Sequence, residues 1–138
     1  MTAVLVDSNV LLDVLTENPR WFDWSAGARA GCAEASVLAI NPIIYAEVSI
    51  RFQRIEDLED VLPEPQFRRL ALPFEAAFLA GKAFLRYRRR GGARVAPLPD
   101  FYIGAHAAVS GFALLTRDAR RYRSYFPRLE LIEPRTAA

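Results

Sequence analysis

The sequence predicts an α/β fold, a three-layer α/β/α sandwich around a mainly parallel central sheet of about five strands. Short apolar runs alternate with longer amphipathic segments, which is the order that right-handed crossovers between parallel strands produce. Acidic residues stand where several apolar runs end. The 138 residues, 52% of them hydrophobic, fit one domain with a filled core, which we expect over residues 1–134, followed by a flexible tail over residues 135–138.

Each expected strand is a short apolar run bounded by polar or turn-forming residues. The first run closes at Asp7, and the fourth is followed by Thr116. Buried parallel strands are continuously apolar because helices cover both faces of the sheet. The expected strands are residues 3–7, 36–40, 69–72, 112–115 and 129–132.

The expected helices are amphipathic segments with recognisable starts and stops. Ser8 and Asn9 can cap the first helix, which Pro19 ends. Asn41 and Pro42 form a favourable start, with asparagine at the N-cap and proline at the first helical position. The expected helices are residues 10–17, 21–35, 42–52, 55–62, 73–88, 100–110 and 118–125.

Composition excludes several classes of protein. No apolar run approaches the roughly 20 residues of a transmembrane helix, and no basic stretch precedes the first apolar run as in a signal peptide. Cys32 is the only cysteine, which excludes an intrachain disulfide and fits a reducing cytosol. We therefore expect a cytoplasmic protein with no membrane contact. The absence of a cysteine–histidine cluster in the sequence argues against zinc.

Four carboxylates lie at the ends of hydrophobic segments. Asp7 closes the first apolar run, and Asp118 follows the fourth by way of Thr116. Asp100 opens a helix, and Glu47 interrupts the apolar face of another. Ligands bind outside the carboxyl ends of the strands in open α/β sheets, so we expect all four acids to converge there.

Carboxylates brought together repel one another, and a hard divalent cation removes that cost. The four acids therefore predict a Mg²⁺ or Mn²⁺ site. Each acid taken alone has a plainer explanation: Asp118 as a helix cap, Asp100 as a first-turn acid, and Glu47 as a partner of Arg51. Asp7 is the hardest to explain in this way, because a carboxylate that ends a buried strand needs several donors or a cation.

Neighbouring polar residues fit supporting roles. Asn9 and Thr116 stand beside two of the acids and can orient them, with helix capping as the alternative. Asp13, on the first helix, is expected to be solvated. The sequence offers no serine–histidine pair, glycine-rich phosphate loop or suitably placed lysine, so a bound metal must carry the catalysis. Such metals usually act on phosphate esters.

Four motifs together resemble those of PIN-domain nucleases, in the same order and with similar spacing. The motifs are Val4–Leu12, Tyr45–Glu47, Pro99–Ala107 and Leu114–Tyr122. The resemblance spans almost the whole chain, from about Ala3 to Glu133. The compact length makes the chain most similar to the VapC toxins of bacterial type II toxin–antitoxin pairs. Ser8 replaces the threonine often found there, and either hydroxyl can cap or donate.

The resemblance implies a PIN-like fold and a Mg²⁺- or Mn²⁺-dependent endoribonuclease. It also implies a homodimer, neutralised by a bound antitoxin protein. By resemblance, the metal-binding and catalytic residues are Asp7, Glu47, Asp100 and Asp118, with Asn9, Thr116 and Ser8 in support.

Two arginine clusters flank the acids along the chain, and concentrated positive charge beside a metal site suits RNA phosphates. The alternative is a solvated helix end, where cations are favoured in any protein. The first cluster contains Arg86, Arg88, Arg89, Arg90 and Arg94, and the second contains Arg117, Arg120, Arg121 and Arg123. The candidates for RNA binding are Arg88, Arg89, Arg90, Arg94, Arg117, Arg120 and Arg121.

Other residues of the chain have structural interpretations, and two other functions remain alternatives. Trp21, Phe22 and Trp24 are expected in the core or a subunit contact, and His106 in the core or an interface. A metal-dependent phosphatase or phosphoryl-receiver domain is an alternative, although Asn9 stands where such a phosphatase needs a second aspartate. A non-catalytic PIN-like module that binds RNA or protein is another alternative, against which the complete acidic quartet argues.

Overall fold

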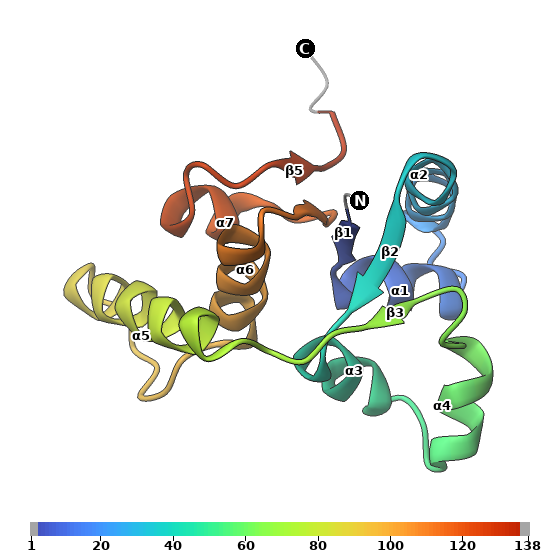
Figure 1. Ribbon diagram of the computed structural model, residues 1–138, viewed down its shortest axis with the longest axis horizontal. Helices are drawn as coiled ribbons and strands as arrows, with labels where there is room; N and C mark the ends of the chain where they lie inside the picture. Colours follow the sequence, from blue (N-terminus) through green and yellow to red (C-terminus); the bar gives the residue numbers. More distant parts are fainter. Residues whose placement is uncertain (1–2, 136–138) are drawn as a thin grey trace.

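The computed structural model describes residues 3–135 and contains the predicted parallel sheet (Figure 1). Five strands lie in the order β3-β2-β1-β4-β5, and every neighbouring pair is parallel. The predicted fold class is therefore confirmed. Of the predicted tail, residues 136–138 lie outside the described residues. The strands are β1 Ala3–Val6, β2 Val37–Ile40, β3 Arg68–Arg69, β4 Ala113–Leu115 and β5 Leu131–Ile132.

Seven helices join and cover these strands in the described part of the chain, which gives a three-layer α/β/α sandwich. One group packs α1 against α2 and α3, and another packs α6 against α5 and α7. Figure 1 shows α5 and α6 on one side of the molecule and α3 and α4 on another. The helices are α1 Ser8–Leu15, α2 Phe22–Ala35, α3 Pro42–Ser49, α4 Ile55–Val61, α5 Phe74–Arg89, α6 Pro99–Ser110 and α7 Arg120–Tyr125.

The core lies between the sheet and these helices. Leu5 and Val6 of β1 and Leu114 of β4 are fully buried, as expected for central strands covered on both faces. His106 of α6 is also buried, and its Nδ1 accepts a hydrogen bond from the Asn41 side chain at 3.0 Å. The prediction of a core histidine is confirmed. None of the helices within residues 3–135 is both long and apolar enough to cross a membrane.

Two helix starts differ from the prediction by two residues, and the others agree to within one. Helix α1 begins at Ser8 rather than Val10, and its N-cap is Asp7, whose side chain accepts a hydrogen bond from the Ser8 amide. Helix α7 begins at Arg120 with Ala119 at the N-cap position, so Asp118 lies in the loop before it, where its Oδ1 accepts from the Arg120 amide at 3.4 Å. Both differences concern candidate acids. Asp7 lies between β1 and α1, and Asp118 lies between β4 and α7.

The order of the strands fixes where a ligand can bind. β1 lies between β2 and β4, so connections leave it towards opposite halves of the sheet. The backbone amide of Asp7 donates to the carbonyl oxygen of Leu115 at 2.9 Å, which joins the carboxyl ends of β1 and β4. This is the topological switch point, where α/β sheets bind their ligands.

Candidate functional site

The four candidate acids line one pocket of about 660 Å³ at this switch point. Asp7 comes from the end of β1 and Asp118 from the loop after β4. Glu47 reaches the pocket from α3, and Asp100 from the first turn of α6. The parallel sheet thus brings together side chains that are up to 111 positions apart, between Asp7 and Asp118.

Asp7 is the innermost acid, with only 4% of its surface exposed. The Ser8 amide donates to its Oδ1 at 2.8 Å, and the Thr116 and Tyr122 hydroxyls each donate to Oδ2 at 2.9 Å. Burial raises the pKa of Asp7 from 3.8 to about 6, and the nearby carboxylates of Asp100 and Glu47 add to the rise. The two hydroxyl donors oppose it without cancelling it.

Glu47 and Asp100 form the next part of the cluster. Glu47 is half-buried and accepts a hydrogen bond from the Ser8 hydroxyl at 2.9 Å. Burial raises the pKa of Glu47, and Asp100 raises it further. The Tyr122 hydroxyl lies 3.3 Å from Oδ1 of Asp100, and Arg121 donates to Oδ2 at 3.2 Å. Among the ion pairs of residues 3–135, none joins Glu47 to Arg51.

Asp118 lies at the outer rim of the pocket, with 47% of its side chain exposed. The Nε and Nη2 atoms of Arg120 donate to its two carboxylate oxygens at 3.0 Å each. These hydrogen bonds lower the pKa of Asp118. The quartet therefore divides into two inner acids with raised pKa values, Asp7 and Glu47, and two outer acids that contact arginines.

Of the predicted supporting residues, Ser8 contacts Asp7 and Glu47 directly, whereas Asn9 and Thr116 act through the Thr116 hydroxyl. Oγ1 of Thr116 donates to Asp7 and accepts from the Asn9 side chain at 3.2 Å. It also accepts from the backbone amide of Asp118 at 3.3 Å. Asn9 in turn accepts from the backbone amide of Arg117 at 3.3 Å. Thr116 and Asn9 thus join the end of β1, helix α1 and the loop that carries Asp118.

The chemistry of this donor set fits a hard divalent cation, because all four acids offer oxygen. As the side chains lie, no three acidic, histidine or cysteine groups within residues 3–135 are close enough together to hold one ion. Arg120 and Arg121 hold the two outer acids. Exposed ion pairs of this kind are worth only about 0–1 kcal/mol, so releasing Asp118 and Asp100 towards a cation costs little.

Asp13 corrects an expectation from the sequence. It is buried rather than solvated, and it accepts hydrogen bonds from the Ser25 hydroxyl at 2.8 Å and from Nε of Arg117 at 2.7 Å. One helical turn separates Asp13 from Asn9, which was the available signal that it shares the inner face of α1. Arg117, a candidate for RNA binding, therefore has a buried partner, and its guanidinium also lies over the Trp21 ring at 5.5 Å.

Tyr122 is a site residue that the sequence analysis did not single out. Its side chain is buried on α7, and its hydroxyl lies between Asp7 and Asp100. Burial raises the pKa of Tyr122 well above its usual value, so the hydroxyl remains protonated. The spacing of Tyr122, Tyr125 and Phe126 marks the buried face of α7, and a buried tyrosine hydroxyl usually has a polar partner.

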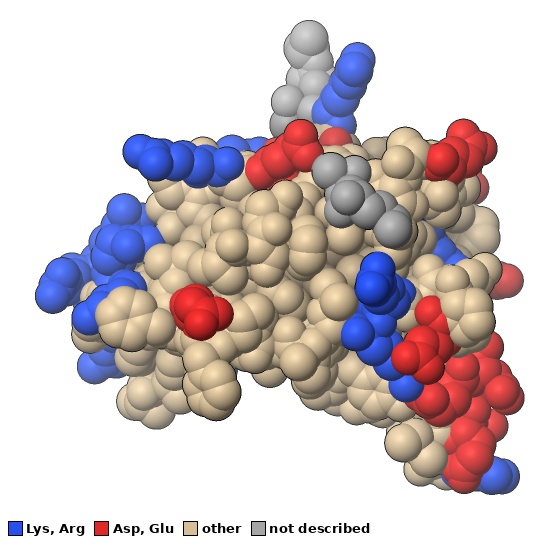
Figure 2. Space-filling model, in the orientation of Figure 1, with Lys and Arg blue, Asp and Glu red and all other residues tan. Residues whose placement is uncertain are grey.

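The first arginine cluster lies at the exposed end of α5 and in the loop that follows. Figure 2 shows basic side chains gathered at that end of the molecule and acidic side chains gathered over α4. The Arg90 guanidinium lies 4.8 Å from the centre of the Tyr125 ring, and Tyr87 and Tyr125 both line the acidic pocket. Arg88 donates to the backbone oxygen of Arg94 at 2.8 Å, which folds the loop back against the helix. This basic surface therefore adjoins the pocket.

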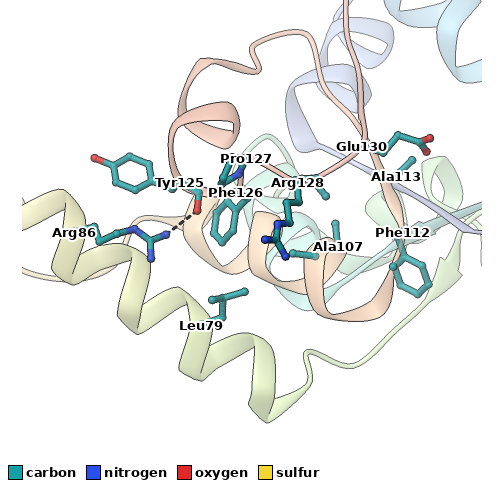
Figure 3. A pocket seen from close by; sticks show the side chains of 13 residues that line it. Leu79, Arg86, Ala107, Phe112, Ala113, Tyr125, Phe126, Pro127, Arg128 and Glu130 are labelled. Atoms are coloured by element: carbon teal, nitrogen blue, oxygen red, sulfur yellow. Dashed lines mark hydrogen bonds between the residues drawn. The ribbon is translucent and has the colours of Figure 1, made fainter.

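A larger pocket of about 810 Å³ lies away from the acids (Figure 3). Arg86 lines it and donates to the backbone oxygen of Tyr125 at 2.7 Å. Its lining is mainly apolar, including Leu79, Phe112 and Phe126, and Glu130 is its only acidic residue. It offers no cluster of metal ligands or nucleophiles, so the acidic pocket is the better candidate for chemistry.

Most of the chain matches a known protein family. The model of the PIN domain family matches residues 4–127. No curated protein sequence matches the chain. Several solved structures share its fold, at sequence identities too low to show more than that.

Three of these structures are of VapBC proteins, and in each comparison 96% of this chain and 98% of the other chain are covered. VapBC2 from Rickettsia felis, bound to a DNA fragment from its promoter, has a TM-score of 0.72 and 17% identity. VapBC-1 from nontypeable Haemophilus influenzae has a TM-score of 0.71 and 16% identity. DNA-bound VapBC from Salmonella typhimurium has a TM-score of 0.69 and 19% identity.

Proposed function

We propose that the chain, which belongs to the PIN domain family, is a divalent-metal-dependent endoribonuclease and the toxin of a cytoplasmic toxin–antitoxin pair. One observation carries the proposal. Four carboxylates from four separate elements line a single pocket, and the inner two have pKa values raised by burial and by neighbouring acids. Carboxylates with shifted pKa values that gather in one cleft are characteristic of functional sites.

Asp7, Glu47, Asp100 and Asp118 are the residues that would hold Mg²⁺ or Mn²⁺. When bound, the ion would lower the pKa of an attacking water and stabilise the leaving oxygen of a phosphodiester. Thr116 and the Ser8 amide hold the Asp7 carboxylate in one orientation, and the Ser8 hydroxyl holds Glu47. These contacts reduce the rearrangement that the inner acids need before an ion binds.

The arginines beside the pocket supply affinity for RNA phosphates. We assign this role to Arg120 and Arg121 at the rim and to the exposed residues at the end of α5. Arg120 and Arg121 donate to the outer acids, and a cation that bound those acids would release both arginines to contact phosphates. Arg117 is set apart, because its guanidinium is paired with buried Asp13. The proposed phosphate-binding residues are Arg88, Arg89, Arg90, Arg94, Arg120 and Arg121.

We also propose that the chain binds a cognate antitoxin and forms a homodimer. The chains of the similar VapBC structures match this one over nearly the full length of both. The family resemblance of the sequence implies both partners. An antitoxin that covers the acidic pocket would block RNA and metal together.

Cleavage of RNA by the purified chain, free of any partner, tests the proposal. Wild type and Asp7→Asn are incubated with total cellular RNA, with Mg²⁺, Mn²⁺ or excess chelator. We expect discrete fragments from the wild type that need the metal, and a loss of about a hundredfold or more in Asp7→Asn, since metal catalysis supplies several kcal/mol. Asp57→Asn, an exposed change on α4, is the matched control and should cleave normally.

The outcomes separate the alternatives. Cleavage that persists in chelator or in Asp7→Asn would mean that the acidic pocket is not the active site. A folded chain that binds metal but hydrolyses a phosphate monoester in place of RNA would favour the phosphatase class. A folded chain that neither cleaves RNA nor binds metal would leave a binding module.

A further inference from the structure

We propose that Tyr122 is a positioning residue, whose hydroxyl orients the Asp7 carboxylate and sets its separation from the Asp100 carboxylate before a metal ion binds. The proposal rests on the metal-dependent function proposed above, because it concerns the same acids. Tyr122 does not itself ligate the metal or contact the substrate. It acts through the two carboxylates that its hydroxyl contacts.

The hydroxyl lies between two acids that come from different elements. It is 2.9 Å from Oδ2 of Asp7, at the end of β1, and 3.3 Å from Oδ1 of Asp100, on α6. A hydroxyl carries one proton, so it donates mainly to the nearer oxygen, that of Asp7. Because of the second contact, the tyrosine oxygen lies between the two carboxylates and limits how closely Asp100 can approach Asp7.

The hydrogen bonds to Asp7 limit the acceptor positions that its carboxylate can offer a cation. An ionised carboxylate has about four acceptor positions, two on each oxygen. On Asp7, the Thr116 and Tyr122 hydroxyls occupy both positions of Oδ2, and the Ser8 amide occupies one of Oδ1. One position on Oδ1 is therefore left without a donor. Without Tyr122, Oδ2 would also regain a free position, and the carboxylate could turn.

Packing holds the Tyr122 ring in place. The side chain is 1% exposed, and its Cδ1 lies 3.0 Å from where a Cβ at position 104 would stand. The same Cβ would lie 2.5 Å from the Phe126 ring. Gly104 therefore lets α7 pack closely on α6, the helix that carries Asp100. One helix contact thus fixes both the hydroxyl and one of the carboxylates that it contacts.

The matched test removes only the hydroxyl. Tyr122→Phe keeps the ring, and Mn²⁺ binding to the full chain is measured by calorimetry without RNA. We expect about a 10- to 100-fold weaker Mn²⁺ affinity, the usual cost of losing a group that orients metal ligands. Tyr45→Phe is the control, because Tyr45 donates to the Glu59 carboxylate at 2.8 Å outside the acidic pocket. It should leave Mn²⁺ affinity unchanged.

A purely structural role predicts a different result. Tyr122→Phe would then lower stability in urea unfolding while its Mn²⁺ affinity stayed equal to that of the wild type, and this outcome overturns the proposal. A wild-type chain that binds no Mn²⁺ overturns it as well. If Mn²⁺ binds and Tyr122→Phe weakens it but neither protein cleaves RNA, the positioning role stands and the nuclease proposal fails.

A second measurement covers the case in which Tyr122→Phe does not fold. The chain has five tyrosines, so ¹³Cζ-labelled tyrosine gives a simple spectrum that Phe variants of the other four assign. During a Mg²⁺ titration of the wild type, the Tyr122 resonance should shift as its hydrogen bonds change, and that of Tyr45 should not. A Tyr122 resonance that stays fixed while Mg²⁺ binds would refute the positioning role.

Discussion

Asp7 is both the N-cap of α1 and a buried acid in a cluster of acids. As the N-cap of α1 it needs a backbone donor, which the Ser8 amide provides. As a buried acid beside Asp100 and Glu47 it is costly to ionise, and its pKa rises to about 6. A bound cation would remove the cost of ionising Asp7.

The raised pKa of Asp7 predicts how the stability of the metal-free protein depends on pH. The folded pKa of about 6 exceeds the ordinary 3.8, so the folded state binds the proton more tightly. The contribution to stability is complete below about pH 4 and is lost as pH rises through about 6. A difference of about two pKa units corresponds to about 3 kcal/mol.

The measurement is urea unfolding of wild type and Asp7→Asn in chelator from pH 4 to 8. The free energy of unfolding of the wild type relative to Asp7→Asn should fall by up to about 3 kcal/mol across this range. Mg²⁺ at pH 8 should stabilise the wild type and not Asp7→Asn. If the two proteins show the same pH dependence, Asp7 is not a strained acid in the folded chain.

At the level of single residues, the sequence predicted that the four acids would share one pocket, but it misplaced Asp13 and missed Tyr122. Asp7 and Thr116 could be located because strand ends follow from apolar runs and a parallel sheet gathers those ends. Asp13 was placed in solvent because a helix pattern does not show which segment will cover a given face. Tyr122 was missed because its role depends on the distance between α7 and α6, which Gly104 sets and no local pattern encodes.

At the level of elements, an ion pair between a buried carboxylate and a partly exposed arginine joins three segments beside the site. Asp13 of α1 accepts from Ser25 of α2 and from Arg117 of the loop after β4. The same loop carries Thr116 and Asp118. The position of Asp118 therefore depends on an interaction whose other members lie on the first two helices.

We predict that Arg117→Ala destabilises the protein by about 3 kcal/mol, because it leaves the buried Asp13 carboxylate without its charged partner. The double variant Asp13→Ala/Arg117→Ala should lose less than the sum of the two single changes, since no unpaired charge remains. Arg121→Ala is the control, because Arg121 is exposed and its pair with Asp100 is worth about 1 kcal/mol or less.

Chemical denaturation measures these stabilities, and RNA binding at matched folded concentration separates the roles of the two arginines. Arg121→Ala should weaken RNA binding with little loss of stability, whereas Arg117→Ala should do the reverse. If Arg117→Ala retains full stability and binds RNA weakly, Arg117 belongs with the phosphate-binding residues after all.

The elements themselves were largely predictable, with exceptions at the sheet edges. Asn41, Pro42 and Pro73 marked helix starts correctly to within one residue, because capping and proline geometry are local. The two edge strands were expected to have four residues each and have two, β3 and β5. An edge strand pairs on one side only, so its length is set by the neighbouring strand rather than by its own apolar run.

At the scale of the whole molecule, α5 presents an apolar stripe to solvent. Phe74 is 92% exposed, Phe78 69% and Leu85 44%. These positions are four and seven residues apart, so they lie on one face of the helix. Gly81 falls on the same face, where a Cβ would meet nothing within 4 Å. Large contiguous apolar patches are uncommon on monomers and mark contact surfaces.

We predict that this stripe joins two copies of the chain, the homodimer that the family resemblance implies. Phe74→Ser/Phe78→Ser should halve the mass measured by light scattering at micromolar concentration. Ile50→Ser/Ile55→Ser removes two other exposed apolar side chains, away from α5, and should leave the mass unchanged. A wild-type chain that is monomeric under these conditions, or a dimer that survives the loss of both phenylalanines, would contradict the prediction.

Gly81 provides a sharper version of the same test. Within one copy of the chain, Gly81→Ala should stabilise α5 by up to about 1 kcal/mol, because alanine favours helix and the added Cβ meets open space. If two α5 helices pack closely at this point, the same methyl group must separate them and weaken the dimer. Greater stability of the monomer together with a higher dimer dissociation constant would therefore locate the contact at Gly81. A variant with a more stable α5 cannot weaken the dimer by unfolding that helix, so the added methyl group itself must separate the two copies. Greater stability with an unchanged dissociation constant would place the interface elsewhere.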